Sequence, residues 1–133
     1  MAGETTIESA LYTLLTSDSS VAALVGTRIY PLLVPDGTTL PAVAYQQISL
    51  VPRKTHSGPN ALLHERYQLT VHASGYDSAR TVRRALRDCL DGYVGDVGMV
   101  HIQEIQVQNE YDGFDLDSDF ATVRIDLIVH FEE

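Results

Sequence analysis

Cysteine and positive charge are scarce in this sequence: its 133 residues include one cysteine and nine basic residues, against eighteen acidic ones. A lone cysteine excludes an internal disulfide. Because Cys89 falls on an apolar stripe at helical spacing, we expect a packed thiol rather than a catalytic one. The formal net charge of −9 argues against a general phosphate-binding surface.

Long apolar runs and catalytic motifs are also missing. No run approaches the roughly 18 apolar residues that span a bilayer, so no membrane contact is expected. The first residues lack the basic and apolar parts of a signal peptide, which favours assembly in a cytoplasm. The sequence holds no G-x-S-x-G, P-loop, G-x-G-x-x-G or H-E-x-x-H pattern, so it predicts neither an enzyme nor a cofactor.

The five histidines do not follow a metal-ligand pattern. None occurs in an H-x-x-x-H arrangement, and His64 and His72, on one face of a predicted strand, would lie roughly 26 Å apart. No metal site is predicted. A cross-strand pair of His101 and His130 stays open as an alternative, because both fall in predicted strands.

Apolar periodicity predicts three helices and four strands. Thr5 and Glu8 have the spacing of a capping box, and Asp18 or Ser19 can cap a second helix that ends at Gly26. The helices are expected at residues 6–16, 21–25 and 78–92, the last capped by Asp77, and the strands at 42–51, 63–73, 99–109 and 120–131.

Two of these strands change the parity of their apolar positions, at Gln46–Gln47 and Gln103–Glu104, which predicts either a β-bulge or a strand packed on both faces. Polar connections at 52–62 and 110–119 are expected to join strands as hairpins. The length suffices for one domain, residues 1–133, to bury a core. The predicted class is α+β, with a four-stranded, largely antiparallel sheet packed by helices in the order α-α-β-β-α-β-β.

Four of the nine basic residues fall on the non-apolar side of the third predicted helix: Arg80, Arg83, Arg84 and Arg87. This stripe is either a solvated face, partly neutralised by Asp88 and Asp91, or a surface that meets an acidic patch on another chain. Nucleic-acid binding is disfavoured, because no aromatic residues interleave with these arginines and the chain is acidic.

A second charged segment is acidic and lies between the last two predicted strands: Glu110, Asp112, Asp115, Asp117 and Asp119. Its D-x-D-x-D spacing is typical of a calcium loop, but position six holds Phe120 where that loop needs glycine. A solvated hairpin tip and an acidic docking loop for a partner are the other two interpretations.

The stretch from Val21 to Tyr45 combines a helix end at Gly26, an extended crossing into Pro31 and a strand opened by Pro41. It resembles the phage tail completion family, also called tail terminator or head-to-tail joining proteins. The matching residues are Val21, Leu24, Val25, Gly26, Arg28, Ile29, Tyr30, Pro31, Pro41, Val43 and Tyr45. The order of the predicted elements extends the resemblance over most of the chain.

The resemblance implies a structural ring, usually a hexamer, that caps the tail tube of a phage or phage-like particle and faces the head connector or stopper protein. DNA would pass through the lumen without specific binding, and the protein would lie in the virion tail or neck. A monomeric or dimeric protein-binding module, acting through a sheet edge or the acidic loop, is the alternative.

A ring of identical subunits needs two unlike complementary patches. The arginine stripe and the acidic segment are our candidates for this pair, so reversing Arg84 and Arg87 to Glu should weaken ring assembly in a salt-sensitive way. Further candidate contacts are Arg53 and Lys54 in the connection at 52–62, and Arg28 and Tyr30 on the extended crossing.

Overall fold

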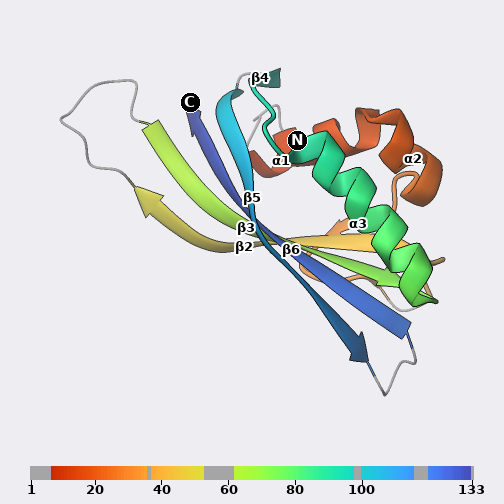
Figure 1. Ribbon diagram of the computed structural model, residues 1–133. Coiled ribbons are helices and arrows are strands. Elements are labelled where there is room, and N and C mark those ends of the chain that lie inside the picture. Colours follow the sequence, from red (N-terminus) through yellow and green to blue (C-terminus); the bar gives the residue numbers. More distant parts are fainter. Residues whose placement is uncertain (1–6, 36, 53–61, 98–99, 116–119, 133) are drawn as a thin grey trace.

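The computed structural model describes residues 7–35, 37–52, 62–97, 100–115 and 120–132. Within these ranges the chain forms three helices and six strands (Figure 1). The helices are α1 (Ile7–Ser17), α2 (Ser19–Val25) and α3 (Tyr76–Leu90). The strands are β1 (Ile29–Pro31), β2 (Ala42–Pro52), β3 (Leu62–Ala73), β4 (Gly95–Val97), β5 (Val100–Asp115) and β6 (Phe120–Glu132).

The strands form one sheet in the order β1-β2-β3-β6-β5-β4. β1 is parallel to β2, and every other neighbouring pair is antiparallel. The α+β class is therefore confirmed, but the predicted four strands are wrong: the sheet is mixed and has six. The two extra strands, β1 and β4, are its outer edges and contain three residues each.

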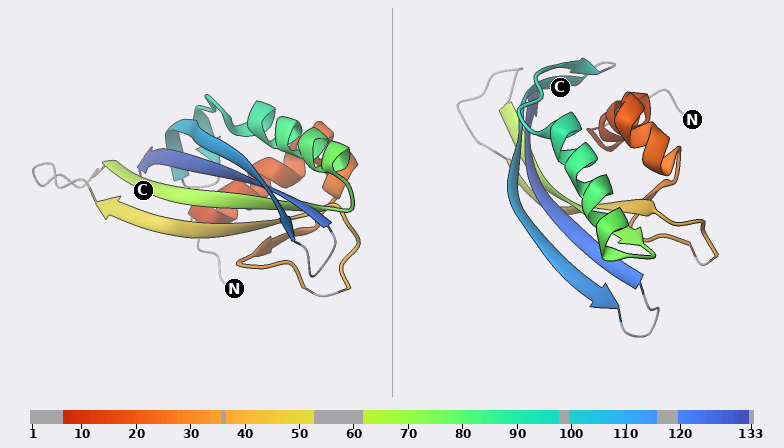
Figure 2. Two further views of the ribbon diagram at one scale, coloured as in Figure 1. Left: turned by 60° about the horizontal axis from the view of Figure 1, so that its bottom comes forward. Right: turned by 45° about the vertical axis from the view of Figure 1, so that its right-hand side comes forward.

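All three helices cover the same face of the sheet, and the long strands curl around α3 (Figure 2). α3 packs on β3, β5 and β6 and also contacts α1 and α2. The core lies between these layers, and alternate residues of β6 supply its centre: Val123, Ile125, Leu127, Val129 and Phe131. This is the predicted inward face of that strand. No helix in the described ranges has the length and apolar character that crossing a membrane requires.

The predicted helix boundaries are largely confirmed, with one correction. Asp18 caps α2, since its Oδ1 accepts hydrogen bonds from the amides of Ser20 and Val21 at 2.9 and 3.1 Å. The predicted cap by Asp77 is wrong. α3 begins earlier, Gly75 is its N-cap without a side-chain hydrogen bond, and Asp77 lies in its first turn.

Bulges occur near both predicted positions. The β2–β3 register shifts between Gln47 and Ser49, and the β5–β6 register shifts between Ile102 and Glu104. A second shift in β5, between Val107 and Asn109, was not predicted. The hairpin loop expected at 110–119 is wrong in its first half, because β5 continues to Asp115. The connection predicted at 52–62 falls mostly outside the described residues.

Candidate interaction surface on α3 and β5

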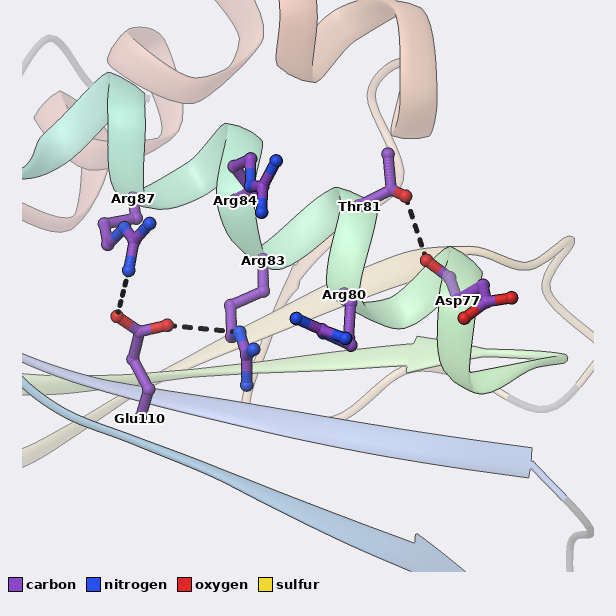
Figure 3. A pocket seen from close by; sticks show the side chains of 7 residues that line it. All are labelled: Asp77, Arg80, Thr81, Arg83, Arg84, Arg87 and Glu110. Carbon is purple, nitrogen blue, oxygen red and sulfur yellow. Dashed lines mark hydrogen bonds and ion pairs between the residues drawn. The ribbon is translucent and has the colours of Figure 1, made fainter.

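α3 has an apolar side and a cationic side. Its buried residues recur at three- and four-residue steps: Ala79, Val82, Leu86 and Leu90. Cys89 packs beside them, as predicted. The arginines that the sequence singles out lie together along the other side of the helix, over β5 (Figure 3): Arg80, Arg83, Arg84 and Arg87.

Arg83 and Arg87 are bound by carboxylates of the same chain. Arg83 Nε lies 3.1 Å from Glu110 Oε1, and its Nη1 lies 2.8 Å from Asp112 Oδ1. Arg87 Nη1 lies 3.2 Å from the other oxygen of Glu110. The Arg83 and Glu110 side chains are only 19% and 20% exposed, so this pair is less screened by water than an ordinary surface pair. The structure thus joins the predicted basic stripe to the first part of the predicted acidic segment.

Tyr76 extends this network at the start of α3. Its hydroxyl donates to Asp112 Oδ2 at 2.7 Å, and Arg80 Cζ lies 5.6 Å from the centre of its ring, within cation–π distance. The hydrogen bond to Asp112 raises the pKa of the Tyr76 phenol above its usual value, because it stabilises the protonated hydroxyl. Tyr76 therefore contacts Arg80 through its ring and Asp112 through its hydroxyl.

An open pocket of about 430 Å³ runs along this side of α3. It is lined by Asp77, Arg80, Thr81, Arg83, Arg84, Arg87 and Glu110 (Figure 3). Arg84 has no ion pair in the described part of the chain. Within the same ranges, Asp88 and Asp91 form no ion pairs with the arginines of α3, so the partial neutralisation considered above is not seen. Asp91 instead accepts a hydrogen bond from the Val107 amide at 3.1 Å. Of the four arginines on this side of α3, Arg84 is therefore the most available to an outside carboxylate.

Arg28 and Tyr30 lie away from this surface. The Arg28 guanidinium donates to the carbonyls of Pro41 at 3.0 Å and Leu24 at 3.3 Å, so it ties the end of α2 to the start of β2. Tyr30 lies half-buried in β1. The structure does not describe the side chains of the remaining predicted site residues. Asp115 ends β5, and Arg53, Lys54, Asp117 and Asp119 lie outside the described residues.

Three features of the surface were not predicted. Tyr76 precedes the predicted helix at 78–92, and Glu110 falls in the predicted connection at 110–119, whereas the structure places Tyr76 in α3 and Glu110 in the strand that faces it. Leu32 and Leu33, the most exposed large apolar residues in the described ranges, were not singled out. The sequence does mark them, because a leucine pair between Pro31 and Pro35 belongs to no helical or strand period.

The described residues contain no group of three histidine, cysteine, aspartate or glutamate side chains that could hold a metal ion. The open alternative of a paired His101 and His130 is not realised, because the register places Glu104 opposite His130. His101 instead meets Asp96 of β4, with Nδ1 and Oδ1 2.5 Å apart. The chemistry that the surface offers is ion pairing.

The family described as "Tail completion protein gp17" matches residues 9–132, which is nearly the whole chain. No curated protein matches the sequence.

A solved structure described as "Virion of native gene transfer agent (GTA) particle" contains a chain with the same fold. The TM-score is 0.74 at 19% sequence identity, and the match covers 96% of this chain and 95% of that one.

Proposed function

This chain belongs to the tail completion protein gp17 family of structural virion tail proteins, and on that premise we propose that it forms a ring that caps the tail tube of a phage-like particle. Family membership also confirms that the chain is not an enzyme. The observation that carries the proposal is the family match over residues 9–132, and the shared fold with a chain of a gene transfer agent virion supports it. The proposed partners are further copies of the chain, the tail tube protein and the head connector or stopper protein.

Ring closure by identical subunits requires heterologous contacts, in which one patch meets a different patch on the next copy. The cationic side of α3 is suited to be one of these patches. It concentrates four of the nine basic residues of a chain with net charge −9, so the charged residues elsewhere on a neighbouring copy are mainly carboxylates. Arginine suits this contact because its planar guanidinium can bind a carboxylate with two hydrogen bonds.

The internal ion pairs assign different roles to neighbouring arginines. Arg83 and Arg87 already hold Glu110 and Asp112, whereas Arg84 has no described ion pair and Arg80 stacks on Tyr76. Arg80 and Arg84 are therefore the better candidates for a contact between copies. The charge reversal Arg87→Glu, suggested by the sequence as a test, would also break the ion pair between Arg87 and Glu110 and so destabilise the fold.

The double reversal Arg80→Glu and Arg84→Glu tests this proposal. We expect native mass measurements to show a hexamer-sized ring for the unmodified chain, and a roughly tenfold higher concentration for half-assembly of the variant. The difference should shrink at high salt, because salt screens partly exposed charges. Arg66→Glu is the matched control, since Arg66 lies outside the pocket and bonds to Gln108 of β5.

Electron microscopy of purified tails with the labelled chain tests the capping role directly, and label at the head-proximal end of the tube is the expected result. An unchanged native mass of the double variant at every salt concentration would refute the role of the arginines. A chain that stays monomeric at high concentration and does not bind tails would refute the ring, and would favour the protein-binding module.

A further inference from the structure

The turn that follows β1 presents two leucines to solvent. Leu32 is 69% exposed and Leu33 is 68% exposed. We call Pro31, Leu32 and Leu33 the leucine turn. Single exposed apolar residues are ordinary on a protein surface, but two adjacent ones at the edge of a sheet form a small patch that water disfavours.

The backbone of the leucine turn adopts a conformation that leucine rarely takes. Leu32 has a φ of 70°, and it is the only described non-glycine residue with a positive φ. The Leu33 amide donates to the Pro31 carbonyl at 2.8 Å, which closes a three-residue γ-turn of the strained kind around Leu32. A residue held in such a conformation, with its side chain exposed, indicates a role outside the core.

The leucine turn is also fixed to the sheet. The Leu32 amide donates to the Tyr45 carbonyl of β2 at 2.8 Å, which continues the parallel pairing of β1 and β2 past Pro31. The two side chains therefore project from a held backbone. A partner that buries them meets a surface that is already ordered.

Strand addition at this edge is disfavoured, because neither end of β1 offers a free amide hydrogen. Pro31 has no amide hydrogen and its carbonyl accepts from Leu33, while the Ile29 amide donates to Thr27 at 2.8 Å. A partner at the β1 edge is therefore held by the leucine side chains, and backbone pairing contributes little.

The opposite edge of the sheet carries the next most exposed large apolar side chain in the described ranges, Val94, at 64%. It directly precedes β4, which is the outer strand at the other end of the sheet. Two of the other exposed apolar residues, Tyr76 and Tyr111, use their hydroxyls in hydrogen bonds within the chain. The third, Ile48, lies at the bulge of β2.

We propose that the leucine turn of one copy packs against the β4 edge around Val94 of the next copy. The two patches differ and lie at opposite ends of the same sheet, so the contact is heterologous and can repeat around a closed ring. This inference rests on the proposed ring and names an apolar contact within it.

Aspartate substitutions at the two edges test the contact. Leu33→Asp and Val94→Asp should each raise the protein concentration at which half of the chains are in rings by about tenfold or more. The reason is that each substitution buries a charge at an apolar contact. Ile48→Asp is the matched control, with the same change at an exposed apolar residue outside both the leucine turn and β4, and should assemble like the unmodified chain. Circular dichroism melts of each variant verify that the fold is intact.

Leu32→Gly separates the proposed role from a merely structural one. Glycine adopts positive φ without steric cost, so the melting temperature of this variant should stay the same or rise while its assembly weakens. A structural role for Leu32 predicts the opposite pair of results, a lower melting temperature with unchanged assembly.

Mixing the two edge variants provides the sharpest test. Leu33→Asp keeps an intact β4 edge and Val94→Asp keeps an intact leucine turn, so one good contact can form between them. Mass measurements on an equimolar mixture should show heterodimers and no closed rings. Rings in either variant alone at the unmodified concentration would overturn the contact.

Two other outcomes are distinguishable from these. If the unmodified chain forms no ring with or without tails, the proposed function fails and this contact fails with it. If Leu33→Asp forms normal rings but no longer binds tails, the ring stands and the leucine turn binds the tail tube instead, which overturns the contact between copies.

Discussion

Adjacent arginines on α3 have different environments and therefore different roles. Arg83 meets two carboxylates and is 19% exposed, whereas Arg84 is exposed and lacks an ion pair in the described ranges. Fully exposed ion pairs contribute about 0.2–1 kcal/mol to stability, and partial shielding places Arg83 toward the upper end of that range. Arg83 thus stabilises the fold, and the proposed contact between copies rests on Arg84 rather than on Arg83.

The raised pKa of the Cys89 thiol predicts how the free energy of unfolding changes at alkaline pH. Burial, together with nearby Asp18, raises the pKa of its thiol from 9.0 to about 12. Between these values the unfolded chain has lost a proton that the folded chain keeps, so the free energy of unfolding should fall as pH rises from about 9 to 12. Urea unfolding midpoints at pH 7, 9 and 10.5 measure this decrease.

A Cys89→Ala variant is the control for this measurement, and its decrease should be smaller than that of the unmodified chain. Tyr67 contributes a residual decrease, because burial raises its pKa in the same direction. A variant whose midpoint falls as steeply as that of the unmodified chain would contradict the assignment to Cys89.

At the scale of elements, β5 is tied to α3 by the two oxygens of Glu110. These hold Arg83 and Arg87, which lie one helical turn apart. Asp112, further along the same strand, adds to this link, because both Arg83 and Tyr76 bind it. The far half of β5 therefore stays in the sheet even though its sequence is typical of a polar loop.

Glu110→Gln tests this tie. Removing the charge weakens both ion pairs, so unfolding should cost about 1 kcal/mol less, and backbone amides at 111–113 should exchange with solvent several-fold faster. Hydrogen exchange followed by mass spectrometry measures this change. High salt should reproduce part of the effect in the unmodified chain.

Glu104→Gln is the matched control on the same strand. Glu104 is exposed, and its described side-chain contact is a weak hydrogen bond from Gln106 at 3.4 Å. Exchange rates at 111–113 should therefore be unaffected. Equal rates in both variants would show that the ion pairs do not hold this part of β5.

At the scale of the whole molecule, net charge predicts the response to DNA. The chain carries −9, and two of its four clustered arginines are neutralised internally. We expect no binding of a labelled duplex at 150 mM salt up to about 100 µM protein, where nonspecific DNA-binding proteins already bind. Fluorescence anisotropy measures this, and salt-dependent binding at micromolar concentrations would contradict the proposal of a non-binding lumen.

The long elements could be predicted because their side-chain periods are local. β3, β6 and α3 repeat apolar residues over ten or more positions, and burial follows those repeats. β1 and β4 were missed as strands because three residues are too few to show a period. The start of α3 was misplaced because Asp77 is as suitable in a first turn as at a cap.

The sequence by itself determined the family, the amphipathic character of α3, the inward faces of β3 and β6, and the acidity of the chain. These properties depend on residue type and on spacing along the chain. Only the tertiary structure decided which charges remain available to a partner. Glu110 and Asp112 are separated from Arg87 and Arg83 by 23 and 29 residues, and they meet because the curled sheet carries β5 beneath α3. Such contacts depend on distances across the fold, which no local pattern encodes.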